Sequence, residues 1–271
     1  MANSENINGT GADPATYQIS YSKVVAYNFC PQKYRLVFVE RWFAPSNQFI
    51  ALGHSIHKTL ELFHTRKGLE SLDDLLECYN EAWVSDGFTS PQIAQEFYEK
   101  GERMLVRYWD DNQDRKTEIL FVEKHFAFDL DGVKLRGIID RIDRHPDGTV
   151  EVIDYKTHNE VWDQAKADGD LQLSVYYMAA RDLLGTPPDL LSYYFLAHGR
   201  VVSTHRTPQQ IEEALKVISE ARAQILAKNF VPNTAACPRC DFREKCPHSI
   251  ARSPEPVEKP GTFSIKDLLE R

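Results

Sequence analysis

Two short runs near the middle of the chain alternate apolar and polar residues, which is the period of a β-strand. They cover residues 133–143 and 150–156, and between them stands His145–Gly148, whose Pro-Asp-Gly sequence is typical of a tight turn. A third strand-like run covers residues 118–128 and leads into the first of them through Asp131-Gly132. The pattern therefore predicts an antiparallel three-stranded meander.

Apolar residues recur with helical spacing on both sides of this meander. Before it, we expect helices over residues 20–39 with a break at Pro31, from Gly53 to about Arg66, and over 69–109 with a break near Asp86–Phe88. After it, we expect a helix from Leu171 that stops before Gly185, strands over 190–197 and 201–205, and a helix over 208–228. This order predicts an α/β fold with a mixed central sheet flanked by helices.

Length and charge narrow the class of protein. The chain has 271 residues, enough for one large domain, and a formal net charge of −8. That charge argues against a generally basic nucleic-acid-binding surface, although a local basic groove stays open. No run of about 18 apolar residues is present, so the sequence predicts no membrane span and no membrane partner.

The two ends of the chain differ in composition from the middle. Residues 1–16 lack the basic and apolar regions of a signal peptide, and we expect them to form a disordered lead-in to a cytoplasmic protein. Residues 253–271 begin with a proline-rich stretch and are expected to form a stiff linker followed by a short tail. The folded domain is therefore expected over residues 17–252.

The predicted hairpin carries charged residues that suit metal-ion chemistry. Asp154 and Lys156 are two positions apart on one strand and share a face, which Asp140 can reach from the preceding strand. Two carboxylates and one ammonium can bind a hard divalent cation and orient a water molecule beside it. For an isolated Asp-x-Lys, the alternative is a surface hairpin with a salt bridge.

Polar residues on three other predicted elements are further candidates. His57 lies on a helix, where a lone histidine is often a polar residue at the edge of a core. Gln172 and Tyr176 are four positions apart and share a helix face, either at a site or at the polar edge of a packing helix. Glu123 stands in an otherwise apolar strand, as support for a ligand site or simply facing an edge.

Five cysteines form a pattern of their own. Three of them lie close together and a fourth is remote in sequence: Cys237, Cys240, Cys246 and Cys30. Soft thiolates in a reducing compartment bind an iron–sulfur cluster or zinc, and three ligands in one segment with one remote ligand favour a [4Fe–4S] cluster. His248 leaves a zinc site of three cysteines and one histidine open, and Cys78 is expected to be an ordinary buried thiol.

Taken in order, these motifs resemble the PD-(D/E)xK nuclease superfamily. Within it, they are similar to the RecB-like iron–sulfur nucleases, which include the nuclease domains of AddB-type recombination proteins and the CRISPR-associated adaptation nucleases. The resemblance extends over residues 20–247, with Gly53 and His57 in Gly-x-x-x-His, Gly137 and Asp140 in Gly-x-x-Asp, Asp154 and Lys156 in Asp-x-Lys, and Gln172 and Tyr176 in Gln-x-x-x-Tyr. It implies a restriction-endonuclease-like core whose N- and C-terminal segments are joined by the Fe–S cluster.

The resemblance also implies a role for each motif residue. The implied ligands of Mg²⁺ or Mn²⁺ are His57, Asp140, Asp154 and the main-chain carbonyl of Tyr155. Lys156 would position or activate the water, and Gln172 and Tyr176 would orient Lys156 and the DNA backbone. Nearby cations, for which we considered Lys33, Arg35, Arg136 and Arg141, would hold the phosphates and make DNA binding salt-dependent.

We therefore expect a metal-dependent DNA nuclease, and specifically an exonuclease of DNA repair or recombination that acts on single-stranded or duplex ends. The chain contains no Gly-x-x-x-x-Gly-Lys-Ser/Thr motif, so a helicase would have to be a separate partner. One alternative is an adaptation nuclease that works with CRISPR integration proteins. Another is a non-catalytic Fe–S scaffold that binds DNA ends, although binding alone has no chemical need for His57, Asp140, Asp154 and Lys156 together.

Overall fold

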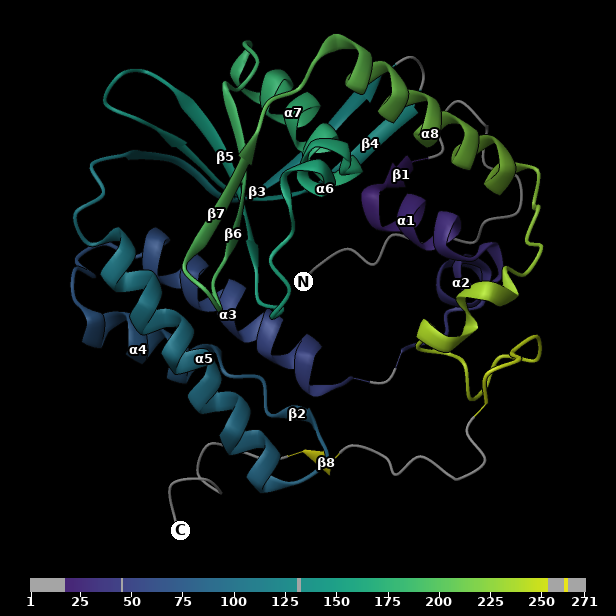
Figure 1. The fold of residues 1–271 in the computed structure, drawn as a ribbon, viewed down its shortest axis with the longest axis horizontal. Coiled ribbons are helices and arrows are strands. Elements are labelled where there is room, and N and C mark those ends of the chain that lie inside the picture. Colours follow the sequence, from purple (N-terminus) through teal and green to yellow (C-terminus); the bar gives the residue numbers. More distant parts are fainter. Residues whose placement is uncertain (1–17, 45, 131–132, 253–260, 263–271) are drawn as a thin grey trace, which may run out of the picture.

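A six-stranded mixed sheet lies at the centre of the molecule (Figure 1). The computed structural model describes residues 18–44, 46–130, 133–252 and 261–262. The sheet follows the order β1 (Gln18–Ser20), β4 (Val133–Arg144), β5 (Val150–Lys156), β6 (Leu190–Phe195) and β7 (Arg200–Thr204), and β3 (Glu118–Leu130) pairs with β4 as well. The predicted meander β3–β4–β5 is confirmed as antiparallel, whereas β1 runs parallel to β4 and β6 runs parallel to β5.

The long strand β4 shares one of its two edges between two partners. β3 pairs along almost the whole of the other edge. On the shared edge, β1 pairs with residues 134–136 and β5 pairs with residues 141–144. Residues 137–140, which carry the Gly-x-x-Asp motif, therefore lie where the two partners leave a gap.

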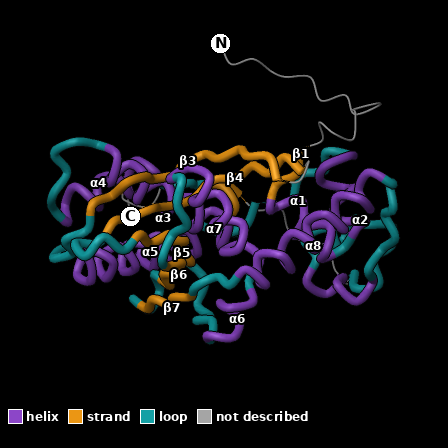
Figure 2. The backbone as a smooth tube through the Cα atoms, turned by 90° about the horizontal axis from the view of Figure 1, so that it is seen from above, coloured by secondary structure: helices purple, strands orange, loops and turns teal. Residues whose placement is uncertain are grey.

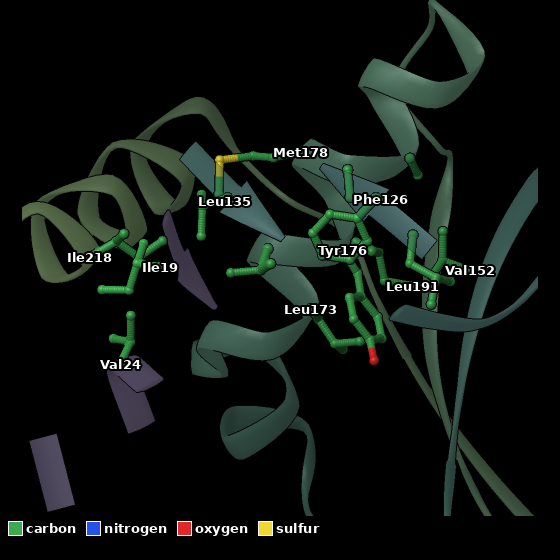
Figure 3. Packing of buried hydrophobic residues seen from close by; sticks show 14 of the residues in the cluster. Ile19, Val24, Phe126, Leu135, Val152, Leu173, Tyr176, Met178, Leu191 and Ile218 are labelled. Carbon is green, nitrogen blue, oxygen red and sulfur yellow. The ribbon is translucent and has the colours of Figure 1, made fainter. Parts of the chain in front are cut away.

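Helices cover both faces of the sheet (Figure 2). One face packs against α7 (Leu171–Leu184), α8 (Pro208–Leu226) and α1 (Tyr21–Phe29), and the other packs against α3 (Gln48–Thr65), α4 (Leu72–Ala82) and α5 (Pro91–Asn112). Figure 3 shows part of the first core, in which Tyr176 and Leu173 of α7 meet Val152 and Leu191 of the sheet. The α/β architecture expected from the hydrophobic pattern is thus observed.

Local sequence explains where several helices begin and end. Ser71 with Asp74 forms a capping box at the start of α4, and Thr207 with Gln210 does the same for α8, satisfying main-chain amides that have no partner within the helix. Helix α7 ends at Gly185, whose φ of 74° is costly for residues with a Cβ atom. Asn47 caps α3, which therefore begins at Gln48 rather than at the predicted Gly53.

The N- and C-terminal parts of the domain lie side by side (Figure 1). Helix α2 (Pro31–Tyr34) continues into a π-helical turn, Arg35–Val39, beside the 3₁₀ helix Thr234–Arg239. The Asn233 side chain donates a hydrogen bond to the carbonyl of Phe29 at 3.0 Å, and Lys33 forms an ion pair with Asp241 at 2.6 Å. Protein contacts therefore join the two ends of the domain, and the expected Fe–S link between them stays a prediction.

Some elements were not expected from the sequence. They are β1, the short strands β2 (Asp86–Phe88) and β8 (Gly261–Thr262), which pair with each other, and helix α6 (Gln164–Gly169). The predicted lead-in 1–16 and, apart from β8, the predicted linker and tail 253–271 lie outside the described residues. Within the described part of the chain, no helix combines the length and the apolar character needed to cross a bilayer.

Candidate active site

The gap beside β4 brings the two predicted aspartates together. The last paired residues of β4 and β5 are Arg141 and Ile153, and continuing that register by one residue places Asp140 opposite Asp154. The strands diverge there, and the main-chain N–H of Tyr155 donates to Oδ2 of Asp140 at 2.9 Å. Both carboxylates are buried, with Asp140 only 7% and Asp154 only 2% exposed.

Gly137 has a steric reason to be a glycine. It lies opposite Phe126 in the β3–β4 register, and a Cβ atom at this position would come within 2.6 Å of the Phe126 ring. The Gly-x-x-Asp motif thus allows β4 to pass under an aromatic ring three residues before Asp140.

Helix α3 supplies the third predicted ligand. Nε2 of His57 lies 3.1 Å from the carbonyl oxygen of Tyr155, the predicted main-chain ligand. Its Nδ1 lies 3.4 Å from Oδ2 of Asp140 and 3.7 Å from Oε1 of Glu123. Both nitrogens of one imidazole therefore face oxygens of the sheet.

Helix α7 supplies the fourth side of the site. Lys156 donates to Oε1 of Gln172 at 2.9 Å, and the Gln172 amide in turn donates to Oδ1 of Asp154 at 2.7 Å and to the Tyr176 hydroxyl at 3.1 Å. The Lys156 ammonium also lies 2.6 Å from Oδ2 of Asp154. Gln172 thus bridges the lysine and the carboxylate and fixes their separation.

The electrostatics of the site fit a cation. Burial and the neighbouring Asp154 raise the pKa of Asp140 to about 7, against the opposing effects of His57 and the Tyr155 amide. Burial alone would lower the pKa of His57, but the surrounding carboxylates outweigh it and raise that pKa to about 9. Oδ2 of Asp154 is buried and accepts no hydrogen bond, since its ion pair with Lys156 lacks hydrogen-bond geometry. Carboxylate oxygens that converge in this way are the donors that a hard divalent ion prefers.

Glu123 belongs to this site. The sequence alone left open whether it supports a ligand site or simply faces an edge. Within the described residues, His57, Glu123 and Asp140 form the one group whose ligand atoms all lie within 4.8 Å of one another. Glu123 has a φ of 44°, in the left-handed region that is uncommon for residues other than glycine. Such outliers concentrate at functional sites, and this one was not predictable from the alternation of β3.

Arg141 is not part of an exposed basic surface, because it is 4% exposed and faces Tyr108 of α5. Its guanidinium forms two 2.6 Å hydrogen bonds with Asp143 and donates to the Tyr108 hydroxyl at 2.7 Å. Of the other cations considered, Lys33 and Arg35 are ion-paired, with Asp241 and Glu40, and Arg136 is exposed.

The four cysteines at the ends of the domain line a single recess. Its volume is about 340 Å³, including space open to solvent, and its lining contains Cys30, Cys237, Cys240, Cys246 and also His248. All five cysteines of the chain are free thiols, and Cys78 is buried in α4 as expected. In the described ranges, no three cysteine sulfurs lie within 4.8 Å of one another.

The chain is similar to known sequences along most of its length. The model of the PD-(D/E)XK nuclease superfamily matches residues 18–247. The Gene 69 proteins of Mycobacterium phages L5 and D29 are 24% and 23% identical to this chain, covering 84% of it and 95% and 96% of their own lengths. A subunit of an ATP-dependent helicase/deoxyribonuclease from Streptococcus agalactiae is 29% identical over 123 residues, which are 42% of this chain and 11% of that polypeptide.

A solved structure shares the fold. A protein from Eubacterium rectale that is provisionally described as an exonuclease superposes with a TM-score of 0.53 and 16% sequence identity, and the match covers 99% of this chain and 98% of that one. At this identity, the likeness concerns the fold alone.

Proposed function

We propose that this chain, which belongs to the PD-(D/E)XK nuclease superfamily, is a metal-dependent deoxyribonuclease that removes nucleotides from DNA ends. The observation that carries the proposal is the convergence of His57, Asp140, Asp154 and Lys156 at the gap beside β4. The ligand atoms of His57, Glu123 and Asp140 all lie within 4.8 Å of one another, and this group is the main structural support for a bound cation.

The donor set fits Mg²⁺ or Mn²⁺. Asp140, Asp154, His57 and the Tyr155 carbonyl would hold the ion together with Glu123, whose carboxylate lies within 4.8 Å of the ligand atoms of His57 and Asp140, and the imidazole shifts the preference towards Mn²⁺. When bound, such an ion supplies charge stabilisation at the phosphate and lowers the pKa of a water molecule.

The protein residues around the ion have separate tasks. Lys156 is held by Gln172 with its ammonium at the carboxylates, where it can hold an attacking water in line with a phosphodiester. The Tyr176 hydroxyl stays protonated, because burial and the nearby aspartates keep its pKa well above its ordinary value. Its task is to accept a hydrogen bond from Gln172 and so fix the position of that side chain.

The test is a cleavage assay on linear single-stranded DNA, linear duplex DNA and covalently closed circles, with Mn²⁺ or with EDTA. We expect nucleotides to be released from linear DNA with Mn²⁺ and none with EDTA, and circles to resist. If circles are cut as well as linear DNA, the protein is an endonuclease and not an exonuclease. Binding of ends without cleavage under every condition would support a non-catalytic scaffold instead.

A helicase partner and a role in DNA repair or recombination also belong to this proposal. Their support is the 29% identity with part of the streptococcal helicase/deoxyribonuclease polypeptide, and that match covers 42% of this chain.

We further propose that Cys30, Cys237, Cys240 and Cys246 bind a [4Fe–4S] cluster that fastens the two ends of the domain together. In support, the four thiols line one recess, and the main-chain N–H of Asn233 donates to Sγ of Cys30 at 3.3 Å. Three ligands in one segment and a fourth that is remote in sequence also suit a cluster held by four cysteine thiolates. Free thiols also fit the expected cytoplasmic location.

Replacing Cys240 by alanine is expected to remove the visible absorbance of protein prepared without oxygen and to lower its melting temperature, because the link between the two ends is lost. Cys78→Ala is the matched control, since this buried thiol lies in α4 and should leave the absorbance unchanged. A colourless wild-type protein with one zinc ion per chain would overturn the cluster in favour of zinc.

A further inference from the structure

Two aromatic rings stand beside Lys156 in the loop that follows β5. The rings of His158 and Trp162 are stacked, with centroids 5.5 Å apart and planes 29° from parallel. The Lys156 ammonium lies 5.6 Å from the centre of the Trp162 ring. The proposed function places the scissile phosphate at the Lys156 ammonium. A base on the His158–Trp162 pair can therefore belong to the nucleotide that carries this phosphate.

The sheet holds this pair in place from below. Trp162 meets the ring of Tyr193 edge to face at 4.8 Å and that of Phe195 at 6.0 Å, and both partners are fully buried residues of β6. His158 also contacts Phe195, at 5.5 Å between ring centres. Trp162 is thus half-buried against a rigid strand, whereas His158 is exposed.

The loop around the rings is anchored at both ends of its turn. The carbonyl of Asn159 lies 2.7 Å from Nε2 of His198, and Glu160 forms an ion pair with Lys166 at 3.2 Å. The Asp163 side chain then caps α6 by accepting from the N–H of Lys166 at 2.8 Å. A ring that is exposed on a fixed loop presents a preformed face, so a ligand that stacks on it has little ordering cost.

We infer that the His158–Trp162 pair is a stacking platform for the unpaired base next to the scissile phosphodiester, so that this nuclease acts on a single-stranded end. The inference rests on the proposed function for the position of the phosphate. Inside a duplex, both faces of each base are already covered by neighbouring bases. A base can lie on His158 beside the cleavage point only when it has left that stack.

The test measures binding of a short, labelled single-stranded oligonucleotide to the full chain in EDTA, where no cleavage occurs. Fluorescence anisotropy gives the affinity, and one abasic site is moved along the oligonucleotide. We expect His158→Ala to weaken binding by about 5- to 150-fold, the range of stacking one base on one aromatic side chain. His158→Phe should restore most of the affinity, because it keeps the ring.

The abasic series separates stacking from a loss of structure. In the wild type, one abasic position should weaken binding clearly more than the others, and in His158→Ala that extra loss should disappear. His205→Ala is the matched control, since His205 is exposed too and contacts a main-chain carbonyl, that of Asp189, at 2.6 Å. It should keep the wild-type profile.

Two results would overturn the platform. One is an unchanged affinity and abasic profile in His158→Ala, and the other is a loss in His158→Ala that blunt duplex ends show equally, which would assign the ring to a terminal base pair. Neither depends on cleavage. If the wild type cuts no DNA but shows the abasic profile, the proposed nuclease function is wrong and the stacking platform stands. If it cuts DNA without showing the profile, the platform is wrong and the nuclease function stands.

Discussion

Replacing Lys156 by methionine is expected to reduce DNA cleavage by about 10²- to 10⁴-fold, the usual contribution of a positioned acid–base group. Methionine keeps an unbranched apolar stem over Tyr193, whose ring centre lies 4.8 Å from the lysine ammonium, so the local packing should hold. The cation itself is lost, and with it the group beside Oδ2 of Asp154. Because Asp140, Asp154 and His57 remain, binding of Mn²⁺ should persist.

Cleavage rates and calorimetric titration with Mn²⁺ on the same preparations check this result. Lys216→Met is the matched control, because Lys216 also lies near a carboxylate, that of Glu220 at 4.0 Å, yet is exposed on α8. Its effect should stay below about fivefold, as for exposed ion pairs. Near-normal cleavage by Lys156→Met would show that another group orients the water, while loss of Mn²⁺ binding would show that the lysine supports the metal site instead.

The part of the site that could be predicted depends on local geometry. Strand alternation places Asp154 and Lys156 on one face, a tight turn brings Asp140 opposite, and spacing of four residues pairs Gln172 with Tyr176. Alternation also puts Arg141 on the face opposite to Asp140, which is why it is buried with Asp143 rather than exposed to a substrate. Strand alternation thus predicts both the position of the aspartates and the absence of Arg141 from the basic surface.

The rest of the site depends on departures from regular structure. Glu123 has a left-handed backbone within β3, and its carboxylate lies 3.7 Å from Nδ1 of His57. Likewise, the contact between His158 and Trp162 arises from the path of an irregular loop over β6. No period in the sequence encodes either feature, because both depend on tertiary contacts between segments far apart in the chain.

The architecture was predictable to a similar depth. Hydrophobic periods identified the meander and the helices around it, but β1 has three residues, too few for a period to show. That short strand has a consequence for the site, since it occupies part of the edge that β5 leaves free and so bounds the gap at residues 137–140. The ligand residues could be predicted from the sequence. The opening beside them could not, because it depends on the order of the strands in the sheet.

Without divalent ions, the protein is expected to become less stable as the pH rises from about 4 to 9. The folded-state pKa of Asp140 is raised from 3.8 to about 7, so its contribution to stability is complete below pH 3.8 and is lost as the pH rises through 7. The pKa of His57 is raised from 6.5 to about 9, so its contribution is complete below 6.5 and is lost through 9. For Asp140 the loss is on the order of 4 kcal/mol, at about 1.4 kcal/mol for each pKa unit.

Urea unfolding in EDTA across this pH range, repeated with Mn²⁺, measures the effect. Since the ion binds the deprotonated carboxylates and imidazole, its stabilisation should be small at pH 5 and large at pH 8, opposing the decline. Asp140→Asn should flatten the metal-free curve and remove most of the stabilisation by Mn²⁺, whereas Asp129→Asn, an exposed carboxylate on β3, should change neither. A metal-free stability that stays level or increases towards pH 8 would mean that the carboxylates at the gap repel one another too weakly to form a cation site.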